Sequence, residues 1–382
     1  MTSKYFDYPK KLDKIFDKLD NLNLSCIIVG GYVRDFYLNK SSKDIDIEVY
    51  GLDSITQLSM ILKEFGEVNE VGKSFGVCKL TLIDLDLDFS MPRIDNKIAL
   101  GHKGFIVQTK KYLDYKTAAF RRDFTINSIG YDTKKKQILD PYNGLIDLKN
   151  KLLKMVDKDS FIEDPLRVFR AVGMVARFDL KVEKHTHNLC SNMIKQKMLN
   201  ELSDQRIYEE LKKLFLKSKR PSKGLIFLKN INGLDFFTEL KLEEKDWNFT
   251  LNAVDKLRDD FILSLTVLCY KLNNTNIASF ISKITNNSKI TKKIILFKNI
   301  ANWMEDKNKT LLYSQMKNIN IDTLKIFLKS ISIKKELLLK LHIIKPKIHG
   351  KDLLKLGFAP SNEMGKLLQL SYEMQLLNYR SL

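Results

Sequence analysis

The pattern of hydrophobic and polar residues divides the chain into two parts. Within roughly the first 145 residues, short apolar runs that predict strands alternate with segments whose apolar residues recur every three to four positions, as in helices. From residue 160 onward the helical period dominates, as in "DPLRVFRAVGMVARF" and "DDFILSLTVLCYKL", and strand patterns almost disappear. The pattern therefore predicts an α+β fold, with a mixed α/β N-terminal part and an all-helical part that takes up more than half of the chain.

The N-terminal part contains a closely spaced series of predicted elements. Apolar residues at helical spacing predict a helix over 9–22, and "SCIIVG" after it predicts a buried strand. "GYVRDFYL" predicts a short helix after a glycine turn, and the alternation of apolar residues with acids in "KDIDIEVYG" predicts a half-buried strand. Further along, we expect a helix over 54–66 with Ser54 as its N-cap, two strands or one long hairpin over 77–93, a loop over 93–112, and strands in "FTINSIGYD" and "QILD".

The charge balance favours a polyanionic partner. Of 382 residues, 65 are Lys or Arg and 46 are Asp or Glu, which gives a formal net charge of +19. Such an excess of positive charge is typical of proteins that bind nucleic acids. The alternative is that the many Lys, Asn and Ile residues reflect an AT-rich genome.

Cysteine usage and hydropathy bear on the cellular context. Cys26, Cys78, Cys190 and Cys269 are scattered and form no CxxC pair, so neither a zinc knuckle nor a disulfide framework is expected. The N-terminus is charged throughout, unlike a signal peptide, and no apolar run approaches the ~18 residues of a membrane span. We therefore expect a cytoplasmic protein with no membrane partner.

The segment "IIVGGYVRDFYLNKSSKDIDIEVYG" (27–51) holds the first candidate site. Strand alternation places Asp44 and Asp46 on one face, with their Cα atoms roughly 7 Å apart. Two carboxylates this close repel each other unless a cation lies between them, and Mg²⁺ is the hard cation that suits oxygen ligands and triphosphates. Asp44 and Asp46 are therefore the candidate catalytic and metal-binding residues, because two metal ions bridged by such a pair activate a hydroxyl and stabilise a leaving pyrophosphate.

The glycine turn ahead of these carboxylates suits phosphate. Gly30 and Gly31 precede a short helix and offer backbone N–H donors to phosphate oxygens, and Arg34 adds a charge-assisted hydrogen bond. A lone Asp-x-Asp is more often a solvated strand, but with the glycine turn and the arginine it predicts a site for a metal-bound nucleoside triphosphate. Asp88 is a candidate third carboxylate on a later strand, although Asp86 shares its face.

Two further motifs concentrate charge near the middle of the chain. "RRDFTINSIGYD" (121–132) places two arginines and Asp123 at the start of a predicted strand. "EDPLRVFRAVGMVARF" (163–178) predicts a helix that begins with acids and a proline, which is ordinary helix capping. Capping does not account for Arg167, which follows Asp164 by three positions on the same predicted helix face.

Taken in this order, the three segments resemble the family of class II tRNA nucleotidyltransferases (CCA-adding enzymes) and bacterial poly(A) polymerases. "GGYVRD…DID" is similar to the metal motif of this family, "RRDFTIN" to its ribose-reading motif, "EDPLR" to its EDxxR base-reading motif, and "ELSDQRIYEE" to the helix that closes its neck. The resemblance implies a catalytic, polymerase-β-like nucleotidyltransferase head (1–145), a helical neck with the base-reading helix (146–217), and a helical body and tail that bind tRNA (218–382).

Hydrogen-bond chemistry explains how such a motif selects a base. Cytosine and adenine each present an amino donor beside a ring-nitrogen acceptor, whereas uracil and guanine present a carbonyl beside an N–H. An aspartate only accepts and an arginine only donates, so Asp164 and Arg167 together match C or A. The resemblance implies this role for both residues, and nucleotide contacts for Arg122, Asp123 and Arg170.

The resemblance leaves three products open: complete CCA, a part of it, or a poly(A) tail. It implies CTP and ATP as substrates, Mg²⁺ as cofactor, the acceptor and TΨC arm of tRNA as partner, and no DNA. "VGKSFGVCKL" (71–80) is more similar to the tRNA enzymes, and a loop of ordinary length at 92–105 favours addition of the terminal A. Gly173 stands where the family often has a basic or polar residue, and Gln205 where a glutamate is usual.

Two competing classes are weighed against this reading. A small-molecule nucleotidyltransferase with the same metal pair would need neither "EDPLR" nor a net charge of +19. A catalytically silent RNA-binding protein would not need Asp44 and Asp46. The five histidines lack the His-Asp arrangement of the phosphohydrolase domain that some family members carry, so that activity is not expected.

Overall fold

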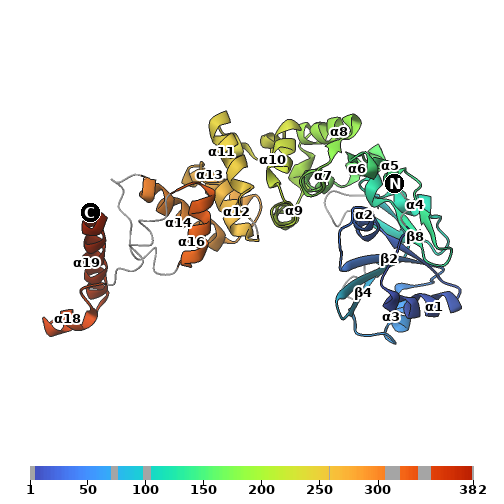
Figure 1. Cartoon of the computed structure of the whole chain (residues 1–382), viewed down its shortest axis with the longest axis horizontal. Coiled ribbons are helices and arrows are strands. Elements are labelled where there is room, and N and C mark those ends of the chain that lie inside the picture. Colours follow the sequence, from blue (N-terminus) through green and yellow to red (C-terminus); the bar gives the residue numbers. More distant parts are fainter. Residues whose placement is uncertain are drawn as a thin grey trace. The chain divides into compact units, whose positions relative to one another are not determined.

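The computed structural model describes residues 5–69, 76–97, 105–257, 259–305, 319–333 and 346–380. The chain divides into two compact units, which Figure 1 shows in sequence colours. The first unit comprises residues 1–203 and 227–236, and the second comprises residues 204–226 and 237–382. The head, neck and body boundaries expected at residues 145 and 217 stay predictions.

A mixed seven-stranded sheet organises the first unit (Figure 1). Its strand order is β3 (Val68–Asn69), β4 (Val77–Leu82), β5 (Leu85–Ser90), β2 (Asp44–Tyr50), β1 (Ser25–Val29), β8 (Gly130–Asp132), β9 (Gln137–Leu139). β2 and β5 run parallel, whereas the other neighbouring strands are antiparallel. The expected mixed head is therefore confirmed.

The described part of the first unit also contains helices, some of which pack on this sheet. They are η1 (Lys10–Leu12), α1 (Asp13–Asn21), α2 (Gly31–Tyr37), α3 (Ile55–Leu62), α4 (Tyr115–Phe120), η3 (Thr125–Asn127), α5 (Gly144–Lys149), α6 (Lys158–Glu163), α7 (Leu166–Phe178), α8 (Lys184–Lys195), η4 (Met198–Glu201) and η5 (Gly233–Asp235). The predicted N-cap of α3 is confirmed, because the Ser54 hydroxyl accepts a hydrogen bond from the backbone N–H of Gln57 (3.2 Å).

β2 is the half-buried strand that its alternation predicts. Ile45, Ile47 and Val49 lie in the core with the apolar face of α1, and each is at most 1% exposed. Asp44 and Asp46 point to the opposite face and remain accessible to solvent. The strand thus anchors two carboxylates on a rigid, buried support.

Two predictions for the head are wrong. The expected loop at 93–112 contains a pair of antiparallel strands, β6 (Arg93–Lys97) and β7 (Phe105–Thr109). The two glycines of this stretch lie between the strands in sequence, whereas most of its charges belong to β6 itself or follow β7. The strand expected to start in "FTIN" begins at Gly130 instead. Residues Thr125–Asn127 form η3, stabilised where the backbone N–H and hydroxyl of Ser128 donate to the carbonyl of Thr125 (3.0 and 2.7 Å).

The described part of the second unit is helical. Its helices are α9 (Asp204–Lys217), η6 (Thr238–Leu240), α11 (Glu244–Val254), α12 (Phe261–Leu268), α13 (Asn274–Ser282), α14 (Ser288–Glu305), α16 (Ile321–Ser330), α18 (Gly350–Lys355) and α19 (Asn362–Arg380), while α10 (Pro221–Asn230) crosses from the second unit into the first. Trp247, Phe280 and Phe327 fill its core.

A small parallel pair of strands, β10 (Leu152–Leu153) and β11 (Lys181–Val182), lies in the first unit. In the residues described, none of the helices has the length and apolar character needed to cross a membrane.

Candidate active site

Four aspartates on two parallel strands form an acidic face. Asp44 and Asp46 project from β2, and the strand register places Asp86 of β5 beside Asp44 and Asp88 beside Asp46. Because both strands alternate with the same period, all four side chains lie on one face of the sheet. Asp88 also forms an ion pair with Lys79 (3.0 Å). We call Asp44, Asp46, Asp86 and Asp88 the acidic face.

The surroundings of Asp46 raise its pKa. Loss of hydration around the carboxylate is the largest cause, and the charges of Asp88, Glu48 and Asp44 act in the same direction, whereas Arg122 opposes them. Within the described ranges, no three His, Cys, Asp or Glu groups converge closely enough to hold a metal ion. A divalent cation on the acidic face would therefore combine carboxylate oxygens with oxygens from a bound ligand.

A glycine with a positive φ joins β1 to α2 beside this face. Gly30 has φ +71°, a conformation that residues with a side chain disfavour. A Cβ atom there would lie 2.8 Å from Nη1 of Arg122 and 3.7 Å from Oδ2 of Asp46. Glycine is therefore required for backbone conformation and for space, and the turn brings the start of α2, at Gly31, close to Asp46.

Arg34 lies inside the protein and is 5% exposed. Its Nη1 donates to Oδ1 of Asn127 (2.5 Å), and its Nε and Nη2 donate to Oδ1 of Asp35 (2.8 and 2.6 Å). The guanidinium also lies 4.4 Å from the ring centroid of Phe178, at the end of α7. Nη2 of Arg177, the preceding residue of α7, donates to Oδ2 of Asp35 (3.1 Å). Arg34 thus joins α2 to α7, and its direct contact with a nucleotide stays a prediction.

Glu48 belongs to the site, although the sequence did not reveal it. The alternation of β2 predicts an exposed side chain, yet Glu48 is 1% exposed. Its Oε1 accepts from Nη2 of Arg121 (3.0 Å) and of Arg122 (2.8 Å), and its Oε2 accepts from the hydroxyl of Tyr50 (3.0 Å). Burial alone would raise the pKa of Glu48, but the charges of Arg122 and Arg121 hold it below its ordinary value. The available signal was the adjacent arginine pair, which needs a carboxylate partner when buried.

Asp164 lies outside the helix that the sequence predicts for it. α7 begins at Leu166, with Pro165 as its N-cap, and Asp164 is extended, with φ −123° and ψ 96°. The prediction that Asp164 and Arg167 share a helix face is therefore wrong, because a proline disfavours the helical conformation of the residue before it. The Asp164 carboxylate accepts a hydrogen bond from the backbone N–H of Leu166 (3.2 Å), which orients it at the start of α7.

Arg167 reaches from the first turn of α7 to the "RRD" segment. Its Nη1 donates to the carbonyl of Ser160 (2.8 Å) and to the Ser160 hydroxyl (3.2 Å), and its Nη2 donates to the carbonyl of Arg121. Burial lowers the pKa of Arg167, while the charges of Asp123 and Asp164 oppose this shift. The fold therefore brings the predicted ribose-reading and base-reading motifs together.

Asp123 is the centre of a second set of hydrogen bonds and is 5% exposed. It accepts from Nδ2 of Asn127 (2.9 Å), from the backbone N–H of Phe124 (2.8 Å), and from Nε of Arg170 (2.6 Å). Burial alone would raise the pKa of Asp123, but the charge of Arg170 and the hydrogen bond from Asn127 lower it. Asp123 therefore stays ionised inside the protein and holds Arg170 of α7.

Gly173 lies between two arginines on one face of α7. It follows Arg170 by three positions and precedes Arg177 by four, which places all three on one side of the helix. No heavy atom of the residues described here would come within 4 Å of a Cβ atom at Gly173. The departure from the family pattern therefore leaves open space on the face of α7 that carries Arg170 and Arg177.

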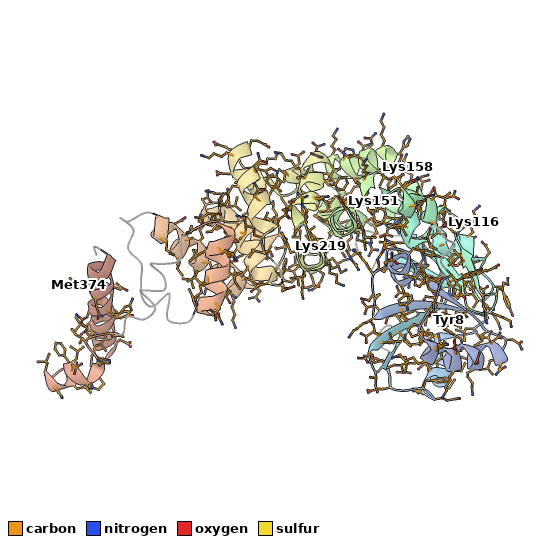
Figure 2. All side chains as sticks on the ribbon, in the orientation of Figure 1. Tyr8, Lys116, Lys151, Lys158, Lys219 and Met374 are labelled. Carbon is orange, nitrogen blue, oxygen red and sulfur yellow. The ribbon has the colours of Figure 1, made fainter. Side chains whose placement is uncertain are left out.

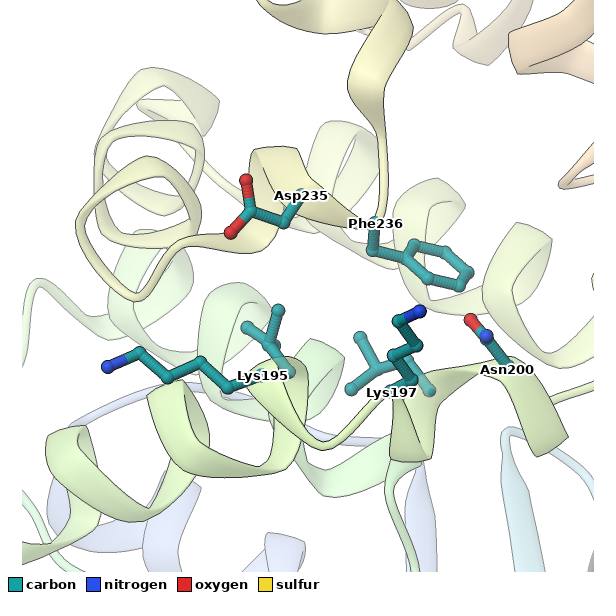
Figure 3. Close-up of a pocket in the computed structure, with 7 residues that line it drawn as sticks. Lys195, Lys197, Asn200, Asp235 and Phe236 are labelled. Atoms are coloured by element: carbon teal, nitrogen blue, oxygen red, sulfur yellow. The ribbon is translucent and has the colours of Figure 1, made fainter.

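A separate pocket lies between the end of α8, η4 and η5 (Figure 3). Its volume is about 280 Å³, and it is lined by Ile194, Lys195, Lys197, Leu199, Asn200, Asp235 and Phe236. Phe236 also packs edge-on against Phe169 of α7, with ring centroids 5.9 Å apart. None of the predicted site residues is among those that line this pocket.

The mixed sheet with accessible aspartates beside a glycine turn defines a nucleotidyltransferase head. Residues 26–154 match the family model of the poly A polymerase head domain. Over 325 residues the chain is 31% identical to the CCA-adding enzyme of Francisella tularensis subsp. novicida, and the match covers 78% of this chain and 84% of that one. This chain therefore belongs to the family of CCA-adding enzymes, the class II tRNA nucleotidyltransferases.

Other comparisons differ in how much of each chain they cover. The chain is 30% identical over 221 residues to the A-adding tRNA nucleotidyltransferase of Geobacter sulfurreducens, and the match covers 57% of this chain but 24% of that protein. A solved structure of a CCA-adding enzyme in its apo form II has a TM-score of 0.75 and 21% identity, and the alignment covers 97% of this chain and 93% of that one. The expected α+β fold is confirmed by this likeness.

Proposed function

We propose that this protein adds C, C and A to the 3′ end of tRNA from CTP and ATP, with release of pyrophosphate. The observation that carries the proposal is the pair of accessible carboxylates, Asp44 and Asp46, beside the Gly30 turn in a chain of this family. Addition of the terminal A alone is the alternative that the name of the Geobacter relative favours. A poly(A) polymerase is the second alternative, since the head matches that family model.

The acidic face suits Mg²⁺. Asp44 and Asp46 offer carboxylate oxygens on one side of β2. The pKa of Asp46 is raised first by loss of hydration and then by neighbouring negative charge, which a cation would relieve. Mg²⁺ bound there would neutralise the triphosphate and acidify the attacking hydroxyl. We propose Asp88 rather than Asp86 as the third catalytic carboxylate, because Asp88 lies beside Asp46 and its charge acts on Asp46 more strongly than that of any other acid. Asp88 would act through this charge and not as a third ligand of one metal ion.

The remaining site residues would contact different parts of the nucleotide. The triphosphate would lie at the start of α2, at Gly31, where the first amides of a helix point outward without intrahelical partners. Arg122, Asp123 and Arg170 would contact sugar and phosphate. Arg34 would support the turn from within the protein.

Asp164 and Arg167 would read the base. A guanidinium carries five N–H donors, so the three contacts of Arg167 described above orient it and leave donors for a base. The Asp164 carboxylate supplies the acceptor that the exocyclic amino group of C or A requires. The arrangement therefore needs no helix face shared by the two residues, because the turn at Pro165 places both at the start of α7.

The positive charge of the chain suits a tRNA partner. Exposed lysines such as Lys116, Lys151, Lys158 and Lys219 occur in both units (Figure 2). Lysines that contact phosphates release condensed counterions, so we expect RNA binding to weaken steeply with salt. The helical part of the chain would hold the acceptor and TΨC arm by shape and phosphate contacts. A cytoplasmic location is part of the same proposal.

An extension assay tests this function. Purified protein and Mg²⁺ would be given tRNA transcripts that end before C, after C, and after CC, with CTP, ATP or both, and the 3′ ends would be sequenced. We expect CCA on all three transcripts. Asp88→Asn should slow extension strongly, whereas Asp86→Asn, a matched change on the same strand and face, should slow it much less.

Each other result has a definite meaning. Extension of the CC-ended transcript alone would establish an A-adding enzyme, and long A tails on any RNA would establish a poly(A) polymerase. Equal loss from Asp86→Asn and Asp88→Asn would refute the assignment of the third carboxylate. No extension of any transcript would refute the proposed activity.

A further inference from the structure

Six side chains connect the glycine turn to the base-reading helix, in a ring that α7 itself completes between Arg170 and Arg177. From α2, Arg34 donates to Asn127 and to Asp35. From η3, Asn127 donates to Asp123, which accepts from Arg170 of α7. The ring closes where Arg177 of α7 donates to Asp35. We call Arg34, Asp35, Asp123, Asn127, Arg170 and Arg177 the polar ring.

Asn127 is the one uncharged side chain of the polar ring, and it is 6% exposed. Its Oδ1 accepts from Arg34 (2.5 Å), and its Nδ2 donates to Asp123 (2.9 Å). The cation on one side requires an acceptor and the carboxylate on the other requires a donor. Of the neutral groups available at this length, an amide supplies both at fixed geometry. Because the amide is neutral, it also avoids the repulsion that a second carboxylate would have with Asp123.

The backbone of Asn127 adds a third contact to the candidate site. Its carbonyl accepts from Nη1 of Arg122 (3.3 Å), the arginine that also pairs with Glu48 and opposes the raised pKa of Asp46. Asn127 therefore touches Arg34, Arg122 and Asp123, three residues predicted to bind the nucleotide. No other residue of η3 has this set of contacts among those described.

We propose that Asn127 is a positioning residue for nucleotide transfer: its amide fixes Arg34 and Asp123 relative to each other, and thereby fixes the Gly30 turn relative to α7. The inference rests on the proposed function and extends it to the last residue of "RRDFTIN", which was not among the predicted site residues. The Gly30 turn would bind the triphosphate of the substrate, and α7 would bind its base. The Asn127 amide would therefore fix the distance and orientation between the two binding regions.

The contacts of Asn127 also suggest a test that distinguishes a positioning residue from one that only supports the fold. In Asn127→Asp, an ionised carboxylate would lie in the interior and face Asp123, and both effects would raise its pKa. Arg34, which is already paired with Asp35, would oppose this shift. Once protonated, that carboxyl could donate to Asp123 and accept from Arg34, which restores the contacts of the amide. The other charged groups of the ring, Asp35, Arg170 and Arg177, and Arg122 at the carbonyl, are the same in every variant.

The experiment compares wild type, Asn127→Asp and Asn127→Ala in the extension of a CC-ended transcript with ATP and of a C-ended transcript with CTP. We expect Asn127→Ala to lower kcat/KM by about 10²-fold, because small displacements of positioned groups have effects of that size. We expect a similar loss for Asn127→Asp at about pH 8.5, and a recovery of at least about tenfold relative to wild type at about pH 6. The ratio of Asn127→Ala to wild type should not change with pH.

Thermal unfolding supplies a second measurement on the same proteins. The introduced carboxyl has a folded-state pKa above its unfolded value, so the stability deficit of Asn127→Asp should shrink as the pH falls through that folded value. Stabilisation by CTP with Mg²⁺ should be weakened in both variants at high pH and should recover in Asn127→Asp alone at low pH.

Three outcomes separate this inference from the proposed function. If wild type extends RNA but Asn127→Ala keeps its kcat/KM, or the Asn127→Asp ratio is flat with pH, Asn127 is not a positioning residue. If wild type extends no RNA, the proposed activity fails, and the inference is then judged by the pH-dependent stabilisation with CTP. Loss of stability without recovery at low pH would leave Asn127 a packing residue and overturn the proposal.

Discussion

The acidic face and the polar ring hold buried or crowded charge in different ways. On the acidic face, four aspartates lie on adjacent parallel strands, and the pKa of Asp46 is raised. In the polar ring, each carboxylate lies between cations or amide donors, and the pKa of Asp123 is lowered. The acidic face therefore gains from a cation supplied with the substrate, whereas the polar ring is complete within the chain.

This difference suggests a different role for each region in catalysis. A region that is complete before substrate arrives provides geometry, since its side chains need not reorganise during reaction. A region with crowded like charges provides affinity for a counter-ion, at some expense of stability in the free protein. Substitutions should therefore have opposite effects on stability in the two regions: Asp46→Asn measures the acidic face, and Asn127→Ala, described above, measures the polar ring.

Asp46→Asn should have the largest effect on activity. Loss of a metal-binding carboxylate should lower extension by at least about 10³-fold, whereas RNA binding should be kept. The same change should raise the stability of the free protein near neutral pH. A raised folded-state pKa means that the folded state binds a proton more tightly, so the ionised form of Asp46 destabilises the fold above that pKa.

The measurements for Asp46 are extension rate, RNA binding by filter retention, and urea unfolding without Mg²⁺. In the protein without Mg²⁺, the stability gain of Asp46→Asn should shrink as the pH falls, because protonation of Asp46 removes the penalty of its ionised form. Asp53→Asn, at an exposed aspartate paired with Lys111, is the matched control. If Asp46→Asn were less stable than wild type, the proposed difference between the acidic face and the polar ring would be wrong.

Asp164→Ala should have an intermediate effect, on selectivity rather than on folding. Removing the acceptor should reduce the preference for CTP over UTP by about 1–3 kcal/mol, or roughly 5- to 150-fold, because one partner of a paired recognition is lost. The readout is kcat/KM for both nucleotides on the same transcript, with Glu163→Ala as the neighbouring control. Unchanged selectivity would remove Asp164 from base reading.

Gly173→Ala should have the smallest effect. A glycine inside a helix is about 1 kcal/mol less favourable than alanine, and the space around its Cβ position is open. We therefore expect the urea midpoint to rise while extension is unchanged, with Gly365→Ala of α19 as a second helix position that also has open space. A gain in stability with a loss of extension would mean that a substrate group enters this space, between Arg170 and Arg177.

Sequence patterns predicted the parts of the site whose structure is determined by residues close together in the sequence. The period-two alternation of β2 and the glycine pair predicted the strand, the turn and the two carboxylates, because strand geometry fixes these from neighbouring residues. Pro165 shows a local rule that the prediction should have used, since the residue before a proline leaves the helix. That rule alone would have placed Asp164 correctly.

The rest of the site depends on residues that are distant in sequence. Glu48 is buried because Arg121 and Arg122, 73 and 74 positions later, fold onto it. The burial of Arg34 likewise depends on Asn127 and on the end of α7. No periodicity in a short window contains these partners, so spacing could suggest the charges of the polar ring but not their pairing.

The strand order has a consequence for synthesis of the protein. β1 pairs on one side with β2, which follows it closely, and on the other with β8, which is made much later. Ile27 and Val29 of β1 pack with Tyr115 and Ala119, so their apolar face stays uncovered on the ribosome until that segment emerges. β1 should thus exist first as an open, aggregation-prone edge of the sheet. A nascent head would then need a chaperone, or rapid translation of the segment up to β8, more than the helical unit that follows it.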